Sequence, residues 1–287
     1  MTDIDSKGLT QRLEYAQEIA IHAGQGLMKH FGRLAGFDTK SSAADLVTVA
    51  DQEADDYLRT AVRERFPNDG LISEESDGSA AFVGGLAQTQ KLEFTWCIDP
   101  LDGTTNFVHT YPNFAVSIGI SHKGLVAGGV IHAPARKETF VGGLGIPAEL
   151  NGKKISVSTR EKAEQCLVAT GFSKAADASL DRPLAVLRKI LCNCHGMRRG
   201  GSAALDLCDL ACGRIDAYYE WGLSPWDVMA GQAIVEAAGG RVRNTEGENH
   251  DPFGKSILAT NGRVSMQLLG LLRANSVVDP SGHVRND

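Results

Sequence analysis

The order of helical and strand patterns predicts a layered fold that joins an N-terminal α+β half to a C-terminal α/β half. Amphipathic helices come first, a run of strands with hairpin turns follows, and strands and helices then alternate. Each pattern has one apolar face to bury, so helices and sheets must stack in layers. The 287 residues are enough for a large core. We expect residues 1–152 and 153–287 to form the two halves of one compact catalytic unit.

The N-terminal half is predicted to contain two helices and a β-meander. Apolar side chains at helical spacing predict helices over about Thr10–Phe31 and Thr48–Phe66, and Pro67 stops the second helix. Asn151-Gly152 is a hairpin signal at the end of this half. Alternating or apolar runs predict strands at Leu71–Glu74, Phe94–Ile98, Ala115–Ser121, Leu125–His132 and Thr139–Gly142.

The C-terminal half alternates strand and helix patterns, which is typical of a sheet covered by helices. Strands are predicted at Cys166–Thr170, Ile215–Tyr219, around Val242 and at Ile257–Ala259. Helices are predicted over Leu184–Cys192, Ser202–Cys212, Ser224–Ala238 and Met266–Leu272.

The composition argues against nucleic acid and membrane as partners. The net charge is -6 and no basic run stands out, so a nucleic-acid footprint is not expected. No apolar stretch approaches the length of a membrane span. The N-terminus is polar and acidic, unlike a signal peptide, and we therefore expect a cytoplasmic protein.

The six cysteines are expected to be reduced. Cys192, Cys194 and His195 could combine with Cys208 and Cys212 in a zinc site, but the spacing is not that of CxxC pairs. We expect each cysteine to act as a small buried hydrophobe.

The stretch WCIDPLDGTTNFVH places two carboxylates close together where a strand is expected to end. Asp99 precedes Pro100, which favours extended backbone and predicts that the strand ends there. Asp99, Asp102 and the carbonyl of Leu101 would then flank one turn as hard oxygen ligands suited to Mg²⁺. The backbone amides that follow, from Gly103 onward, could face an anion. Taken alone, the DPLD stretch is better explained as an ordinary acidic turn.

Three further carboxylates lie at the ends of predicted elements. Glu74 closes the short strand, while Asp51 and Asp227 each lie in the first turn of a helix. Thr48 and Ser224, three residues earlier, make capping boxes that explain each aspartate by itself. The combination is harder to explain this way, because several carboxylates in one cavity repel one another unless cations neutralise them.

The motifs DPLDGTTNF and WDVMAG together resemble the paired signature of the inositol monophosphatase family. DLVTVAD, LISEES, GGSAA and DAYYEWG occur in the expected order around them, and the resemblance covers about Leu13 to Leu272. It implies an αβαβα five-layer sandwich of the inositol monophosphatase/fructose-bisphosphatase type. It also implies a Mg²⁺-dependent, often lithium-sensitive phosphatase that is usually a homodimer.

The resemblance implies two or three Mg²⁺ ions per subunit. Glu74, Asp99 and the Leu101 carbonyl would hold the first ion, and Asp99, Asp102 and Asp227 the second. Glu74 would also help to place a third ion through water. The family usually has glycine before its two glutamates, whereas this chain has Ser73.

The resemblance also assigns the catalytic and substrate-binding positions. Asp51 and Thr104 would orient the attacking water, with Glu74 as the third catalytic residue. Lys40 matches a loop lysine near the third ion, although a solvated charge explains it as well. Phosphate and the sugar-alcohol ring would contact Asp102, Gly103, Thr104, Gly201, Ser202, Ala203 and Glu220. Ser202 could equally be a helix N-cap, and Glu220 a surface charge.

The implied reaction is hydrolysis of inositol monophosphates and similar polyol phosphates by metal-activated water. DGTTNF favours these substrates, because nucleotide and histidinol phosphate branches often resemble DGTKxF. The alternatives are histidinol phosphate, fructose 1,6-bisphosphate or 3'-phosphoadenosine 5'-phosphate, and a bacterial relative's added role in transcription complexes. A metal-dependent nuclease is disfavoured by the acidic charge.

Overall fold

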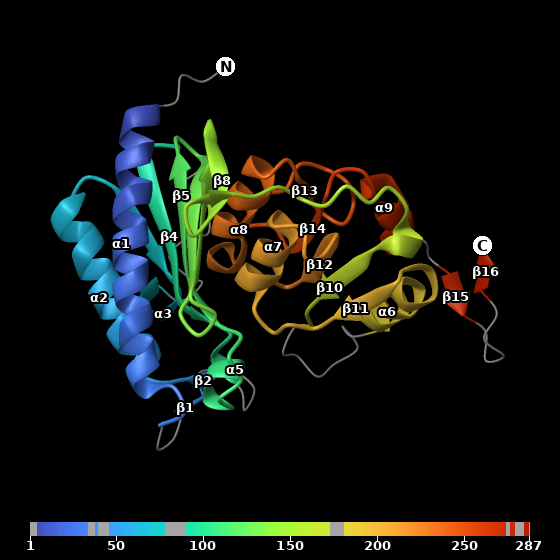
Figure 1. Cartoon of the computed structure of the whole chain (residues 1–287), viewed down its shortest axis with the longest axis horizontal. Coiled ribbons are helices and arrows are strands. Elements are labelled where there is room, and N and C mark those ends of the chain that lie inside the picture. The colour runs from blue at the N-terminus through green and yellow to red at the C-terminus, as the bar shows by residue number, and fades with distance from the viewer. Residues whose placement is uncertain are drawn as a thin grey trace.

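The computed structural model shows five layers in the order helix, sheet, helix, sheet, helix (Figure 1). It describes residues 5–33, 38–39, 46–77, 90–172, 181–273, 276–278 and 284–286. The layers confirm the predicted αβαβα sandwich. The division at residues 152 and 153 into two halves of one catalytic unit stays a prediction.

The first layer consists of α1 (Ser6–His30) and α2 (Val49–Arg65). α1 begins four residues earlier than expected because the Asp5 side chain caps it by accepting from the Gly8 amide. α2 begins after Thr48, which forms a capping box with Asp51. Both helices pack their apolar faces on the same side of the first sheet.

The first sheet has seven described strands in the order β3-β4-β5-β6-β7-β8-β9. All neighbouring strands pair antiparallel except β3 with β4, which are parallel. The bounds are β3 (Gly70–Ser73), β4 (Phe94–Asp102), β5 (Ala115–His122), β6 (Leu125–Ala133), β7 (Glu138–Gly143), β8 (Ile146–Leu150) and β9 (Lys153–Lys154). Two short helices leave this sheet, α3 (Glu74–Asp77) after β3 and α5 (Thr104–Val108) after β4.

The central layer consists of α7 (Ala203–Ala211) and α8 (Pro225–Ala237) between the two sheets (Figure 1). Glycines allow α8 to approach the first sheet closely. A Cβ on Gly129 would lie 2.4 Å from the Ala230 carbonyl oxygen, and one on Gly119 would lie 2.8 Å from Met229. This close approach also brings α8 against β4, which carries the two aspartates next to the edge strand β3.

The second sheet has the order β11-β10-β12-β14-β13 and is covered on its outer side by α6 and α9. β10 is parallel to both β11 and β12, whereas β14 is antiparallel to its neighbours. The bounds are β10 (Leu167–Thr170), β11 (Gly196–Arg198), β12 (Ala217–Trp221), β13 (Arg241–Arg243), β14 (Ser256–Thr260), α6 (Asp181–Asn193) and α9 (Ser265–Arg273). The 3₁₀ turn η1 (Ala163–Gln165) leads into β10, and two hairpins lie outside the layers, β1–β2 (Asp38–Thr39, Leu46–Val47) and β15–β16 (Ser276–Val278, Val284–Asn286).

Several local expectations were wrong. β4 does not end at Asp99 but continues to Asp102, and the sheet also contains β8, which was not expected. Glu74 begins α3 rather than closing β3. All six cysteines are free, but Cys192 is exposed and Cys194 and Cys212 are only half-buried, so the expectation that each is buried fails at these three positions. No helix in the described part of the chain is long and apolar enough to cross a membrane.

Candidate metal and phosphate site

A bulge in β4 brings Asp99 and Asp102 to the same side of the strand. Asp99 pairs with Ser117 and Asp102 with Ala115, so three steps on β4 match two on β5. Side chains alternate along a strand, and residues three apart would otherwise face opposite sides. The one extra residue reverses that alternation, as a β-bulge does. Irregular backbone within a strand therefore aims both carboxylates at the same space, without the strand ending at Asp99.

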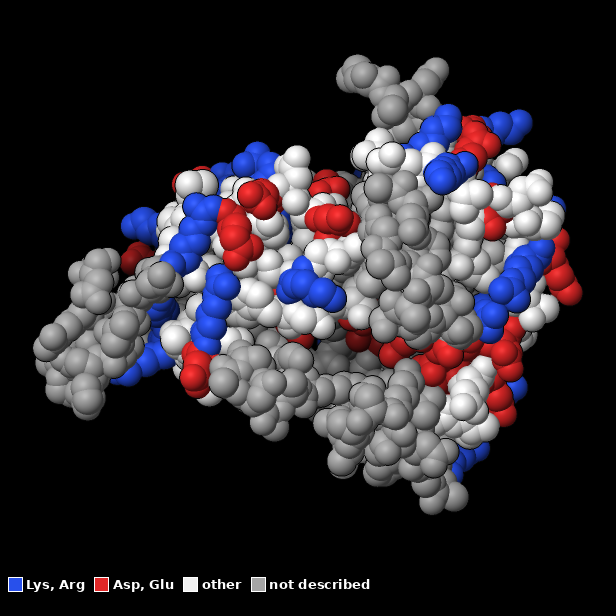
Figure 2. Space-filling view, turned by 180° about the vertical axis from the view of Figure 1, so that it is seen from behind, with Lys and Arg blue, Asp and Glu red and all other residues white. Residues whose placement is uncertain are grey.

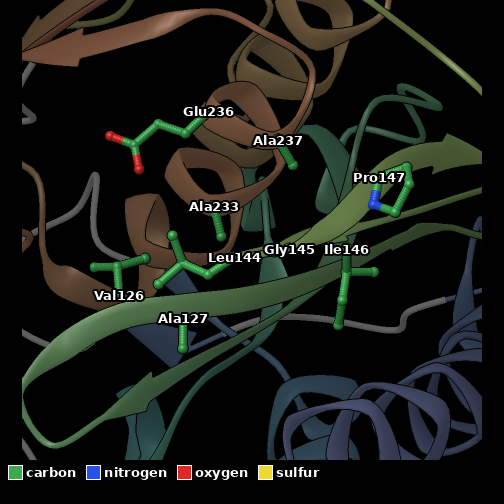
Figure 3. A pocket seen from close by; sticks show the side chains of 10 residues that line it. Val126, Ala127, Leu144, Gly145, Ile146, Pro147, Ala233, Glu236 and Ala237 are labelled. Atoms are coloured by element: carbon green, nitrogen blue, oxygen red, sulfur yellow. The ribbon is translucent and has the colours of Figure 1, made fainter. Parts of the chain in front are cut away.

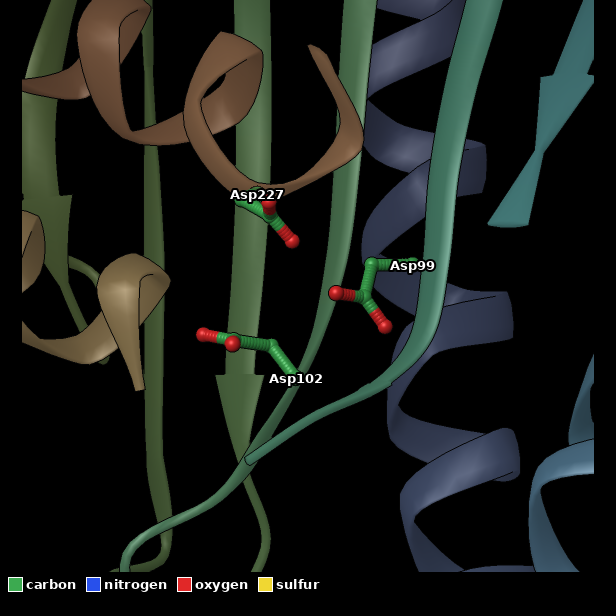
Figure 4. A group of neighbouring side chains, drawn as sticks. All are labelled: Asp99, Asp102 and Asp227. Carbon is green, nitrogen blue, oxygen red and sulfur yellow. The ribbon is translucent and has the colours of Figure 1, made fainter. Parts of the chain in front are cut away.

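Asp227 reaches the same space from the start of α8 (Figure 4). Its Oδ2 accepts a hydrogen bond of 2.7 Å from the Ser224 amide as part of the capping box. Asp227 can therefore cap α8 and also belong to the acidic cluster, because its carboxylate has further lone pairs that can accept. Ligand oxygens of Asp99, Asp102 and Asp227 lie within 4.8 Å of one another. A divalent cation is the usual companion of such an arrangement.

Burial and mutual repulsion disfavour charge on these aspartates. Burial first, and then the charges of Glu74, Asp102 and Asp227, raise the pKa of Asp99 well above its ordinary value. Burial, and then Asp102 and Glu74, likewise raise the pKa of Asp227. Burial raises the pKa of Asp102 to about 6, although its hydrogen bond from Ser202 opposes the change. A hard cation would relieve this repulsion, so the set of donors fits Mg²⁺.

Thr104 connects the acidic cluster to Asp51. Its hydroxyl lies 3.3 Å from Asp51 Oδ1 and 3.2 Å from the Leu101 carbonyl oxygen, so it can donate to either. Asp51 Oδ2 is engaged by the Thr48 amide at 2.9 Å. Asp51 is 1% exposed, which leaves Oδ1 as an oriented acceptor inside the protein. The sequence-predicted pair is therefore brought together.

Gly103 lies between β4 and α5 with φ of 96°. A Cβ there would lie 2.9 Å from the Asn113 carbonyl oxygen, so glycine is required by both conformation and space. The assignment of the Gly103 and Thr104 amides to phosphate stays a prediction.

Ser202 is both an N-cap and a partner of Asp102. Its Oγ accepts from the Leu205 amide at 3.2 Å and lies 2.5 Å from Asp102 Oδ2, to which it donates. The Ala204 amide also donates to that oxygen, at 2.7 Å. The first turn of α7 thus holds Asp102, and places Gly201 and Ala203 beside it. The N-cap interpretation of Ser202 is confirmed, whereas its role in binding substrate stays a prediction.

Glu220 is half-buried next to Gly171 rather than fully exposed at the surface. The Tyr218 hydroxyl donates to Glu220 Oε2 at 2.6 Å. A Cβ on Gly171 would lie 2.0 Å from that oxygen, so only glycine leaves room for this carboxyl group. Burial raises the pKa of Glu220 to about 7, against the effect of the Tyr218 hydrogen bond. Neither Gly171 nor Tyr218 was singled out from the sequence, because both act only through the folded chain.

Two further positions from the sequence analysis are Lys40 and Ser73. Lys40 lies outside the described residues. Ser73, which stands where the family usually has glycine, is fully buried and its hydroxyl donates to Asp55 on α2. This serine therefore ties the end of β3, next to Glu74, to the first layer.

A separate cavity of about 400 Å³ lies between α8 and the β7–β8 turn (Figure 3). Its lining is mainly small and apolar, with Ala127, Leu144, Ala233 and Ala237 around it and Glu236 at its edge. It contains none of the clustered aspartates. On the opposite face of the molecule from that in Figure 1, acidic side chains border a recess (Figure 2), which would attract cations.

Comparison with known proteins agrees with this geometry. Residues 9–276 match the profile of the inositol monophosphatase family. The chain is 38% identical over 262 residues to inositol-1-monophosphatase of Synechocystis, covering 91% of this chain and 88% of that protein. It is 37% identical over 266 residues to the putative Nus factor SuhB of Neisseria meningitidis serogroup B, covering 92% and 98%.

A solved structure shares the fold over most of its length. The extragenic suppressor protein SuhB of Bartonella henselae superposes with a TM-score of 0.82 at 33% identity, covering 92% of this chain and 99% of that one. Family profile, relatives and fold agree across nearly the whole sequence. The chain belongs to the inositol monophosphatase family.

Proposed function

We propose that this protein is a Mg²⁺-dependent phosphatase of inositol monophosphates and similar polyol phosphates. The observation that carries the proposal is the convergence of three carboxylates, from the β4 bulge and the start of α8, within 4.8 Å. Membership of the family supports hydrolysis of a phosphomonoester, while the choice of substrate is our own inference.

The proposed metal ligands follow from the cluster. Glu74, Asp99 and the Leu101 carbonyl would hold one ion, and Asp99, Asp102 and Asp227 a second. A third ion near Glu74 would be bound through water. When bound, Mg²⁺ neutralises phosphoryl oxygens and lowers the pKa of water.

Asp51 and Thr104 are proposed to orient the attacking water. The Thr104 hydroxyl lies 3.3 Å from Asp51 Oδ1, so the pair presents adjacent acceptors to one water molecule. Water oxygen bonds to phosphorus while the ester P–O bond breaks, and the proton of the water passes to Asp51. The departing alkoxide takes a proton from solvent. Most of the rate enhancement would come from positioning and electrostatics, as in other phosphoryl transfers.

Substrate recognition is proposed to use both sides of Asp102. On one side the amides of Gly103 and Thr104 would receive the phosphate. On the other, Glu220 would accept hydrogen bonds from ring hydroxyls, since its carboxyl group is half-buried and already held by Tyr218. The remaining ring contacts would come from Asp102, Gly201, Ser202 and Ala203.

The proposal is tested by phosphate release from inositol 1-phosphate with and without Mg²⁺. Asp227→Asn removes one ligand and keeps an acceptor for the capping bond, so we expect activity to fall at least about 100-fold. Asp56→Asn, at an exposed position of α2, is the matched control and should keep full activity. Undiminished turnover by Asp227→Asn would refute the proposal of a Mg²⁺-dependent phosphatase at this cluster.

The substrate itself is decided by a panel. We expect inositol monophosphates to give the highest kcat/KM, above histidinol phosphate, fructose 1,6-bisphosphate and 3'-phosphoadenosine 5'-phosphate. The reason is that Glu220 and the start of α7 offer acceptors and donors to hydroxyls. A higher kcat/KM for any of the other three compounds reassigns the substrate. Inhibition by lithium is a further expectation, and indifference to high lithium would refute it.

A second candidate is a role in a transcription complex, favoured by the similarity to a putative Nus factor. Recovery of RNA polymerase subunits with the tagged protein from its host would support this role, and metal-site variants would show whether it needs the phosphatase centre. We also propose a homodimer in the cytoplasm, and light scattering on the purified protein measures the first of these properties directly.

A further inference from the structure

The start of α7 is held by contacts that come from outside the acidic cluster. Arg136, in the β6–β7 turn, donates through Nη1 to both oxygens of Asp209 on α7, at 3.0 and 3.1 Å. Its Nη2 donates to Asn113 Oδ1. A guanidinium group can only donate, so it requires the oxygen of the Asn113 amide to face Arg136. The NH₂ group of Asn113 must then face the other way.

That NH₂ group donates to the Gly200 carbonyl oxygen at 2.9 Å. Asn106, in α5, donates to the same oxygen at 3.0 Å and to the Asn113 carbonyl oxygen at 2.7 Å. The Gly200 carbonyl oxygen thus accepts hydrogen bonds from two side-chain amides, both in the segment that follows the DPLDGTT motif. The Gly200 peptide is fixed from the β4–β5 connection, about 90 residues away in sequence.

The Gly200 peptide immediately precedes the turn that holds Asp102. Gly201 has φ of 81°, and two residues further the chain enters α7. A Cβ on Gly200 would lie 2.5 Å from Asp206 Oδ1, so the peptide has no room to shift toward the helix. The Gly200 carbonyl is therefore held two residues before Ser202 and four residues before Ala204, which supply the two donors to Asp102.

We propose that Asn113, oriented by Arg136, is a positioning residue for the metal site. It acts by fixing the Gly200 carbonyl, which places the two donors that hold Asp102 Oδ2. Asn113 is 7% exposed, and its side chain is hydrogen-bonded to the Gly200 carbonyl and to Arg136, neither of which is a proposed metal ligand or substrate contact. Its effect on metal binding rests on the proposed function, whereas its effect on the Asp102 hydrogen bonds does not.

Asn113→Ala tests the positioning in the metal-free protein. Hydrogen exchange of the Ala204 amide, measured by NMR in EDTA, reports its bond to Asp102. We expect exchange to become about tenfold faster, while the Val116 amide in β5 keeps its rate. An Ala204 amide with unchanged exchange would overturn the proposal, and so would equal acceleration at both amides, because that would mean general loosening.

Binding of Mg²⁺, measured by calorimetry without substrate, gives a second readout. We expect Asn113→Ala to weaken binding about tenfold, the size typical of losing a group that orients a ligand. Asn193→Ala is the matched control, since Asn193 also donates its amide to a backbone carbonyl, at 2.8 Å, but on α6. It should leave the affinity unchanged. A wild-type protein that shows protected Ala204 but binds no Mg²⁺ overturns the proposed function and leaves the positioning intact.

A double-mutant cycle tests whether Arg136 acts through Asn113. Arg136→Lys keeps the positive charge beside Asp209 but cannot reproduce the forked contacts to Asp209 and Asn113. We expect it to weaken Mg²⁺ binding severalfold in the wild-type background and to add nothing in the Asn113→Ala background. Additive effects would show that Arg136 works independently and would refute the orienting step.

Discussion

Replacing Asp99 by asparagine should stabilise the metal-free protein while removing its activity. Asp99 is 1% exposed, and its Oδ1 accepts from the Leu101 amide at 2.9 Å, a bond that asparagine retains. The substitution removes a charge from the cluster without changing its shape. Active sites often hold groups at a cost in stability, and here that cost is expected to be repulsion among the ligands.

The magnitude follows from the spacing of the carboxylates. Two unit charges 4.8 Å apart repel by about 3.5 kcal/mol at an effective dielectric constant of 20. Protonation of a carboxyl group in the cluster removes part of this repulsion, so the full cost is not reached. Allowing about 1 kcal/mol for burying the asparagine amide, we expect Asp99→Asn to stabilise the metal-free protein by about 2 kcal/mol at pH 8.

The pH dependence has a definite sign. The folded-state pKa of Asp99 is raised above its ordinary 3.8, so folding favours the protonated carboxyl group. Its contribution to stability is complete below 3.8 and is lost as pH rises through the folded-state value. The advantage of Asp99→Asn should therefore be large at pH 8 and disappear at pH 4.

The assay is urea unfolding of both proteins in EDTA at pH 4, 6 and 8, with the exposed Asp56→Asn variant as the control. Saturating Mg²⁺ should then stabilise the wild type more than Asp99→Asn, because only the wild type has the full ligand set. Equal or lower stability of Asp99→Asn at pH 8 in EDTA would refute the claim that these carboxylates repel one another.

Three other predictions follow from single contacts. Gly171→Ala should raise KM for inositol 1-phosphate about tenfold with little change in kcat. The reason is that a Cβ 2.0 Å from Glu220 Oε2 must displace that carboxyl group. An unchanged KM would remove Glu220 from the substrate site. Gly129→Ala should destabilise the protein by about 2 kcal/mol or more in urea unfolding, because its Cβ would lie 2.4 Å from the Ala230 carbonyl oxygen. If the variant is as stable as the wild type, the close packing of α8 on the sheet is contradicted. Burial lowers the pKa of His250 to about 4, so its contribution to stability is present above 6.5 and is lost as pH falls toward 4. His250→Gln should therefore remove about 3 kcal/mol of the decline in stability between pH 7 and pH 4, and identical pH profiles would count against this.

The sequence alone determined the layered fold and the acidic residues of the candidate site, because both depend on short-range patterns. Helical spacing and capping residues located α2 and α8 to within one or two residues. The carboxylates were recognisable because they lie at element ends beside proline, glycine and capping residues. Local chemistry specifies such positions without reference to the rest of the chain.

The tertiary structure decided how these residues meet. The strand pattern ended β4 at Asp99, and only the pairing with β5 shows the extra residue that turns Asp102 to the same side. The donors that hold Asp102 come from Ser202 and Ala204, about 100 residues later. Bulge register and contacts between distant segments depend on packing in three dimensions, and one-dimensional spacing carries no record of them. Residue types at local signals could therefore be predicted, whereas the partners that orient them were set by the fold.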